Sequence, residues 1–270
     1  MARRDGRRPH GGPGPGKRAG ADDEVPAAGQ LPPDQVVYGR HPVREALRGP
    51  RTVHRLYLTP EAHRVLVDDI PSGMAVDMRD PSELAALAGT TDHQGVVGSV
   101  DRFTYVGIDN LLDRARAAGH PPFVLCLDQV TDPHNLGAIA RVCDAAGADG
   151  LLIPEHRSAQ VTGAVCKASA GAIEHIQVAR CTNLADTLDR VRGADIWAYG
   201  ASERGRVRYT APDYSDGVML VLGSEGAGIR PRVESKCDQL ISVPMAGEVS
   251  SLNVSTVAAL LAFEVVRQRG

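Results

Sequence analysis

Short apolar segments that alternate with helix-forming segments are the feature that most constrains this chain. From Pro121 onward, apolar runs such as residues 123–127 and 218–222 recur between segments with helical periodicity. Strands that are apolar on both faces are typical of parallel sheets covered by helices on both sides. We therefore expect residues 121–270 to form an α/β domain with a mainly parallel sheet. Further strands are expected at 151–153, 173–178, 196–199 and 240–243, and helices at 136–146, 159–169, 184–192 and 252–269.

The remainder of the chain divides where its composition changes. Residues 1–34 combine prolines, glycines and basic side chains with almost no large apolar residue, so they cannot bury enough surface to fold. We expect a disordered basic arm there, which either contacts nucleic-acid phosphates or has no role. Residues 35–100 alternate short strands and helices and are expected to form a small α/β domain. Residues 101–120 are expected to form a linker with a helix over 108–118.

Charge and composition limit the possible partners. The formal net charge is −3, so a nucleic acid could bind only through a local patch. Aromatic residues make up only 4%, which argues against a module that grips single strands by base stacking. Two groups of arginines are candidates for a basic patch, with a solvated helix or loop face as the alternative. They are Arg40, Arg44, Arg48, Arg51 and Arg55, and Arg204, Arg206 and Arg208.

Cysteine usage and hydropathy bear on the cellular compartment. No two of the five cysteines have Cys-x-x-Cys spacing, which argues against structural zinc and against a disulfide framework. The N-terminus lacks the apolar core of a signal peptide, and no apolar stretch approaches the roughly 20 residues of a membrane helix. We expect a cytoplasmic protein that holds no metal and contacts no membrane.

Three segments rich in glycine and polar residues follow predicted strands, where ligands bind in open α/β sheets. Residues 128–141 enter a helix, and Asp132 or Asn135 could simply cap it while Arg141 faces solvent. Residues 222–229 carry three glycines but match neither a dinucleotide-binding nor a Walker A motif, so a plain turn is the alternative. Residues 241–255 end a strand and open a long helix, which Ser251, Asn253 or Ser255 could cap.

Taken together, these segments resemble the SpoU/TrmH family of RNA ribose 2′-O-methyltransferases, within the SPOUT superfamily. The matches are Asn135 to Arg141, Leu222 to Ile229 and Val243 to Val254, in the order and at the separations found in the family. Residues 36–100, beginning at Tyr38 to Val43, look like the small RNA-binding domain of the branch that methylates a guanosine of 23S rRNA. The segment from Val243 to Asn253 is also most similar to that branch.

The resemblance implies a fold, a cofactor and a set of site residues. Family members are homodimers that bind S-adenosyl-L-methionine in a C-terminal trefoil knot, without a metal. Carried onto this chain, the cofactor pocket comprises Leu222, Gly223, Val243, Met245 and Leu252. The polar catalytic set falls on Asn135, Arg141, Glu225, Ser251 and Asn253.

The implied reaction is an in-line transfer of the cofactor's methyl group to a ribose 2′-oxygen. A guanidinium has a pKa above about 12, so we expect Arg141 to fix a phosphate and stabilise developing charge rather than act as a base. Glu225 would orient Arg141 or nearby donors. Alternatives are a tRNA substrate, an rRNA uridine whose methylation confers antibiotic resistance, and a non-catalytic RNA-binding assembly factor on the same fold.

Overall fold

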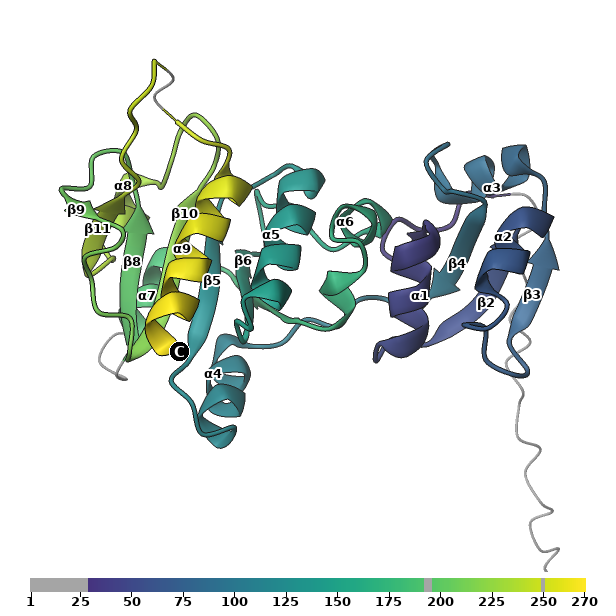
Figure 1. The fold of residues 1–270 in the computed structure, drawn as a ribbon, viewed down its shortest axis with the longest axis horizontal. Helices are drawn as coiled ribbons and strands as arrows, with labels where there is room; N and C mark the ends of the chain where they lie inside the picture. The colour runs from purple at the N-terminus through teal and green to yellow at the C-terminus, as the bar shows by residue number, and fades with distance from the viewer. Residues whose placement is uncertain (1–28, 192–195, 249–250) are drawn as a thin grey trace, which may run out of the picture.

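The computed structural model describes residues 29–191, 196–248 and 251–270, which form two lobes (Figure 1). The small domain contains β1 (Val36–Tyr38), α1 (Arg40–Arg48), β2 (Val53–Leu58), α2 (Pro60–Leu66), β3 (Ala75–Met78), α3 (Pro81–Ala88) and β4 (Val96–Val100). Helix α4 (Ile108–Ala117) follows. The strands of the large domain are β5 (Phe123–Asp128), β6 (Gly150–Pro154), β7 (Gln177–Cys181), β8 (Ile196–Ala201), β9 (Val207–Arg208), β10 (Gly217–Gly223) and β11 (Gln239–Ser242). Its helices are α5 (Pro133–Ala145), α6 (Gly163–Ala168), α7 (Leu184–Val191), α8 (Pro231–Glu234) and α9 (Val254–Arg269), with a 3₁₀ turn, η1 (Ala172–Glu174).

The large domain is built on a seven-stranded sheet in the order β7-β6-β5-β10-β8-β11-β9, and every strand pair in it is parallel. Alternate residues of β5 enter different cores: Leu125 and Leu127 belong to one apolar cluster, and Val124 and Cys126 to another. Both faces of the sheet are therefore covered, as the apolar strands predicted. Helices α5 and α9 lie side by side on one face (Figure 1). The trefoil knot stays a prediction.

The small domain has a mixed four-stranded sheet in the order β1-β4-β2-β3, in which only the pair of β2 and β3 is parallel. Its helices begin at predictable residues: the hydroxyl of Thr59 accepts a hydrogen bond from the N–H of Ala62, and Asp80 and Glu83 form a capping box before α3. The expected small α/β domain is thus confirmed. None of the helices in the described ranges is long and apolar enough to cross a membrane.

The domains meet where α6 and η1 pack against β1 and α1. Between them, Arg51 donates hydrogen bonds to the carboxylate of Glu174, and side-chain exposure is only 7% for Arg51 and 0% for Glu174. Glycine makes the close approach possible, since a Cβ on Gly163 would lie 2.8 Å from the ring of Tyr38. The contact between the domains is therefore a packed interface with a buried ion pair.

The segments before and after the small domain are anchored to neighbouring structure. Most of the expected arm lies outside the described residues, but Leu31 is buried and its N–H bonds to the carbonyl of Leu87. Within the expected linker, Val106 forms a parallel β-bridge with Ala179 of β7, and the hydroxyl of Tyr105 accepts a hydrogen bond from the N–H of Val161. The segment that joins the domains thus extends the edge of the large sheet.

Two predicted elements differ from the structure. The helix expected from residue 159 begins only at Gly163. In a longer helix the N–H of Gly163 would bond to the carbonyl of Ala159, but it bonds to the carbonyl of Pro33 instead. The strand expected over 173–178 is wrong at its start: residues 172–174 form η1 after a turn with positive φ at Gly171, and β7 begins at Gln177. Sequence patterning also missed β9 and α8, each of four residues or fewer.

Candidate active site

A cavity of about 910 Å³ lies at the carboxyl ends of β8, β10 and β11, beside the start of α9. All five residues expected to hold a cofactor line it: Leu222, Gly223, Val243, Met245 and Leu252. Met245 and Leu252 remain 39% and 37% exposed at this opening, although large apolar side chains are normally covered. Apolar walls of this kind, with a few polar groups, are typical of sites for small organic ligands.

The loop after β10 shapes one wall of the cavity. The N–H of Gly228 returns to the carbonyl of Ser224 at 2.9 Å, and Gly226 and Gly228 both have positive φ. A Cβ on Gly223 would lie 2.0 Å from the carbonyl carbon of Gly228, so only glycine fits there. The three glycines therefore fold the loop back on itself beside the cavity, which is more than the plain turn considered as an alternative.

Three polar side chains from the three polar segments meet at the rim of this cavity. Asn135 on α5 donates from Nδ2 to Oε1 of Glu225 at 3.2 Å. Asn253 donates from Nδ2 to Oδ1 of Asn135 at 3.0 Å and also to Oε1 of Glu225. We call Asn135, Glu225 and Asn253 the polar trio. Glu225 and Asn253 line the cavity, whereas Asn135 lies beyond them and is buried.

Asn253 has two roles. Its Oδ1 accepts the N–H of Ser255 at 2.8 Å and so caps α9, as the sequence allowed. Its Nδ2 hydrogens point to the other two members of the polar trio, so every polar group of this amide is used. Ser251 also lines the cavity, and no described residue accepts or donates a hydrogen bond to its hydroxyl. The helix cap thus fixes the orientation of a side chain at the site.

An ion pair between a buried carboxylate and an arginine at the end of the glycine loop was not anticipated. The carboxylate of Asp128, at the end of β5, is fully buried and binds Nη2 of Arg230 at 2.6 Å and the backbone N–H of Arg230 at 2.8 Å. Hydrogen bonding to Asp128 raises the pKa of the Arg230 guanidinium. Asp128 lies opposite Gly223 in the sheet, so this pair ties both ends of the glycine loop to β5. The sequence signal was an acid at the end of an apolar strand.

Arg141 is the one predicted site residue that stands apart. Asp132 caps α5, and the exposed positions of the helix form a stripe that faces away from the sheet: His134, Arg141, Asp144 and Ala145. Arg141 does not line the cavity, and no described residue forms a hydrogen bond or ion pair with its side chain. Glu225 therefore orients the two asparagines, and not Arg141.

The turn after β8 contributes a wall that sequence reasoning did not assign to the cofactor site. Ser202, Glu203 and Arg204 line the cavity. Arg204 binds Glu234 of α8 at 3.0 Å, and Ser202 donates its hydroxyl to the same carboxylate at 3.1 Å. The arginine cluster at 204–208 is therefore partly neutralised, while Arg206 and Arg208 are exposed and have no ion pair among the described residues.

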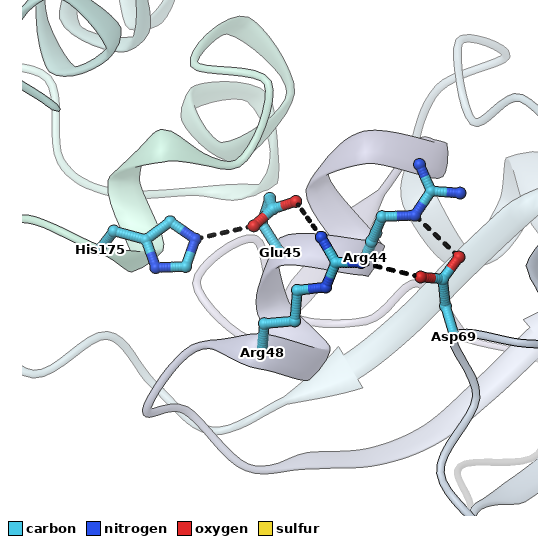
Figure 2. A network of polar contacts seen from close by, with 5 residues as sticks. All are labelled: Arg44, Glu45, Arg48, Asp69 and His175. Carbon is cyan, nitrogen blue, oxygen red and sulfur yellow. Dashed lines mark hydrogen bonds and ion pairs between the residues drawn. The ribbon is translucent and has the colours of Figure 1, made fainter. Parts of the chain in front are cut away.

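The arginines proposed for the small domain are mostly engaged by carboxylates. Arg44 and Arg48 bind Asp69 at 2.8 and 3.1 Å, in a network that also includes Glu45 and His175 (Figure 2). Arg55 binds Asp77 at 3.0 Å. The prediction of a basic patch is wrong for Arg51, which is buried between the domains. Of the five, only Arg40 is exposed and has no described ion-pair partner.

Cysteine and metal chemistry find no support in the described part of the chain. Burial raises the pKa of Cys166 to about 12 and that of Cys181 to about 11, so both thiols stay protonated. Cys126 and Cys143 are fully buried, and burial raises their pKa values as well. No cluster of three or more His, Cys, Asp or Glu side chains in the described ranges is placed to hold a metal ion.

Comparisons with known proteins agree with this geometry. The model of the SpoU rRNA methylase family matches residues 122–263, and the model of the RNA 2′-O ribose methyltransferase substrate-binding domain matches residues 36–106. A Bacillus subtilis protein named as a TrmH family tRNA/rRNA methyltransferase, YacO, is 41% identical over 238 residues, which cover 86% of this chain and 95% of the relative.

Solved structures give the same assignment. The SpoU methyltransferase AviRb of Streptomyces viridochromogenes, solved with AdoMet, superimposes with a TM-score of 0.71 at 26% identity, over 87% of this chain and 90% of that one. An AdoMet-bound rRNA methyltransferase of Sinorhizobium meliloti gives a TM-score of 0.69 at 27% identity, over 86% and 87% of the two chains. With the cavity, the glycine loop and the polar trio in place, the chain belongs to the SpoU family of RNA methyltransferases and carries the substrate-binding domain of its 2′-O-ribose members.

Proposed function

We propose that this protein transfers a methyl group from S-adenosyl-L-methionine to a ribose 2′-hydroxyl of RNA. The observation that carries the proposal is the polar trio at the rim of a cavity with both polar and apolar lining, where segments far apart in the sequence meet. Such a site places a small organic cofactor on one side of the trio and leaves the other side open to a polar substrate. The family of the chain supports the same reaction.

The cavity fits the proposed cofactor. Its volume of about 910 Å³ lies within the range of small-molecule sites, and Leu222, Val243, Met245 and Leu252 give it apolar walls for a purine. Close packing of Gly223 on Gly228 leaves backbone groups of the glycine loop at the wall. The cofactor would supply an electrophilic methyl group, so the chain's own residues need only bind it, position the ribose and accept charge.

The trio would orient the ribose. Oε1 of Glu225 is held by the two asparagines, and no described residue bonds to Oε2. We propose that this free oxygen accepts the hydrogen bond of the 2′-hydroxyl, while Asn135 and Asn253 fix the carboxylate and Ser251 bonds nearby. Arg141 would hold the phosphate and stabilise charge on the 2′-oxygen. To do so it must reach a cavity from which its side of α5 is turned away.

A homodimer would explain how Arg141 can act although it does not line the cavity of its own chain. Next to α5, the outer face of α9 leaves Phe263 48% and Val266 37% exposed, so α9 presents two apolar side chains beside the helix that carries Arg141. We propose that a second copy packs on this surface about a two-fold axis and brings its Arg141 to the cavity of the first. The site is incomplete in one copy without such an arrangement.

Complementation between two inactive variants tests this arrangement. Arg141→Ala and Glu225→Gln, each alone, should lower methyl transfer by at least about 10²-fold while AdoMet binding persists. A heterodimer purified through a different tag on each variant keeps one complete site if Arg141 acts on the partner, so we expect about half the wild-type activity. A heterodimer as inactive as its parents would contradict action across the interface. An Arg141→Ala homodimer with wild-type turnover would contradict the role of Arg141 itself.

We propose a guanosine of 23S rRNA as the target, because the small domain and the segment 243–253 resemble that branch, and the cytoplasm as the compartment. The test maps ribose methylation in rRNA and tRNA from cells that lack the gene, complemented with the wild type or with Gly223→Ala, whose Cβ would occupy the glycine loop. We expect one 2′-O-methylguanosine of 23S rRNA to disappear and to return only with the wild type. Loss of a tRNA or uridine methyl would overturn the target, and no loss would favour a non-catalytic RNA-binding role.

A further inference from the structure

The polar trio divides the carboxyl edge of the large sheet into two sides. The cavity occupies the side of β8, β10 and β11, whereas Asn135 lies on α5 and does not line it. With the cofactor in the cavity, an RNA strand that presents a ribose to the trio must pass on the other side, over the loops that follow β5 and β6. The loop that follows β6 was not part of any binding site described so far.

The two loops form one surface. The carbonyl of Val130, after β5, accepts the N–H of Ala159 at 2.8 Å and the hydroxyl of Ser158 at 3.3 Å. The N–H of Glu155 bonds to the carbonyl of Cys181 at 2.9 Å, which anchors the other end of the second loop. We call residues 129–134 and 155–158 the β5–β6 ledge. Because these hydrogen bonds hold the two loops in place, a side chain on the ledge extends from a fixed backbone.

Arg157 stands out on this ledge. It is exposed, and no described residue forms a hydrogen bond, ion pair or ring contact with its guanidinium. Its φ is +56°, and Gln129 on the neighbouring loop has a φ of +59°, a region that non-glycine residues occupy at a cost. Strained polar residues that surrounding structure holds in place cluster at functional sites. Here two of them lie in adjoining loops beside the polar trio.

The free guanidinium of Arg157 is the group on the ledge that suits a phosphate. The two carboxylates of the ledge keep their charge but bond to other groups, since Asp132 accepts the N–H of His134 at 2.9 Å and Glu155 accepts the hydroxyl of Thr182 at 3.4 Å. The side chains of His134 and His156 are exposed beside Arg157 and add polar groups for a sugar or a base. The small-domain arginines, in contrast, are largely occupied by carboxylates. A guanidinium with all donors free is the group that binds phosphate through two parallel hydrogen bonds.

We propose that the β5–β6 ledge is an RNA-binding surface in which Arg157 binds the phosphate of a nucleotide that flanks the methylated one. The proposal rests on the proposed function and adds to it the path of the RNA strand across the protein surface. Arg157 contributes affinity and position but contacts neither the cofactor nor the reacting atoms. Its loss should therefore weaken RNA binding and leave cofactor binding intact.

The test compares three variants of the full chain. Arg157→Asn removes the charge but tolerates a positive φ, so the loop keeps its conformation. Arg157→Lys retains the charge, and Arg114→Asn removes another exposed arginine, on α4, that also lacks a described ion-pair partner. The probe is 23S rRNA transcribed in vitro without modifications. Its affinity is measured across a series of KCl concentrations, and AdoMet binding is measured by calorimetry.

For Arg157→Asn we expect RNA affinity about 5- to 10-fold weaker near 0.1 M salt, with the slope of log affinity against log salt reduced by about one. Arg157→Lys keeps the charge but not the paired donors, so it should restore the salt slope and only part of the affinity. Arg114→Asn should match the wild type. AdoMet affinity should be unchanged in all three. An unchanged affinity and salt slope for Arg157→Asn would overturn the ledge, as would a loss of AdoMet binding. If the wild type neither binds nor methylates RNA, the proposed function itself fails.

Discussion

Two polar networks of this molecule connect residues that are distant in sequence, and they differ in kind. The polar trio joins Asn135, Glu225 and Asn253 through amide donors of fixed direction at the rim of the cavity. The network in Figure 2 links Arg44, Arg48 and Asp69, and continues through Glu45 to His175 across the domain interface. Arg48 is 58% exposed there, so solvent screens its ion pairs.

A contact between domains and a functional geometry therefore place different demands on polar groups. Exposed ion pairs tolerate rearrangement, because water replaces a lost partner at little cost. The trio also has exposed members in Glu225 and Asn253, but it tolerates less rearrangement, because Asn135 is buried and both donor hydrogens and the oxygen of the Asn253 amide are already bonded. The buried pair of Arg51 and Glu174 is a third case, in which loss of one partner leaves a charge in the protein interior.

Arg51→Met should have the largest effect on stability. It leaves the carboxylate of Glu174, which is 0% exposed, without its cation, and we expect a loss of about 3–5 kcal/mol in the free energy of unfolding. Urea unfolding followed by circular dichroism measures it. Arg48→Met in the exposed network is the control and should cost less than about 1 kcal/mol. Equal losses for the two variants would erase the distinction between the buried pair and the exposed network.

Asn253→Asp should have a smaller effect, and on catalysis instead of stability. Aspartate still caps α9, but it replaces two amide donors with a carboxylate next to Glu225, so we expect kcat to fall by about 10²-fold. Asn183→Asp is a matched control: Asn183 accepts the N–H of Ala185 and donates to Asp186, away from the cavity. In single-turnover assays, we expect this control to transfer the methyl group at the wild-type rate. A comparable fall in both would assign the effect to helix capping.

Much of the fold could be predicted from local pattern. The apolar strands, the parallel sheet and caps such as Asp80 and Asn253 depend on residues close in sequence, and these predictions are confirmed. Where a tertiary partner competes for the backbone, local pattern failed. The start of α6 moved to Gly163 because the N–H of Gly163, which a longer helix would have bonded to Ala159, bonds to the carbonyl of Pro33.

Local sequence pattern predicted less of the candidate site than of the fold. The three glycines indicated a tight backbone path, and Gly223 does pack on the backbone of Gly228, but nothing local pairs Asn135 with Asn253, 118 residues away. Likewise the run of arginines in the small domain looked like a basic patch because its carboxylates lie elsewhere: Asp69 is 25 residues from Arg44, and Glu174 is 123 residues from Arg51. Charge clusters in a sequence therefore need the fold before they predict a surface.

Arg44→Ala should have the smallest effect and separates the small-domain network from an RNA contact. The side chain is one partner of an ion pair with Asp69, so we expect a loss of about 0.2–1 kcal/mol in stability and less than a twofold change in affinity for the 23S rRNA transcript. The double variant Arg44→Ala/Asp69→Ala leaves the net charge unchanged and should return RNA affinity to the wild-type value. If Arg44 instead held a phosphate, removing Asp69 would not restore binding, and the salt dependence would stay reduced in both variants. Filter binding across a salt series therefore tests whether Arg44, which is paired with Asp69, contributes less to the affinity for this RNA than Arg157 on the β5–β6 ledge.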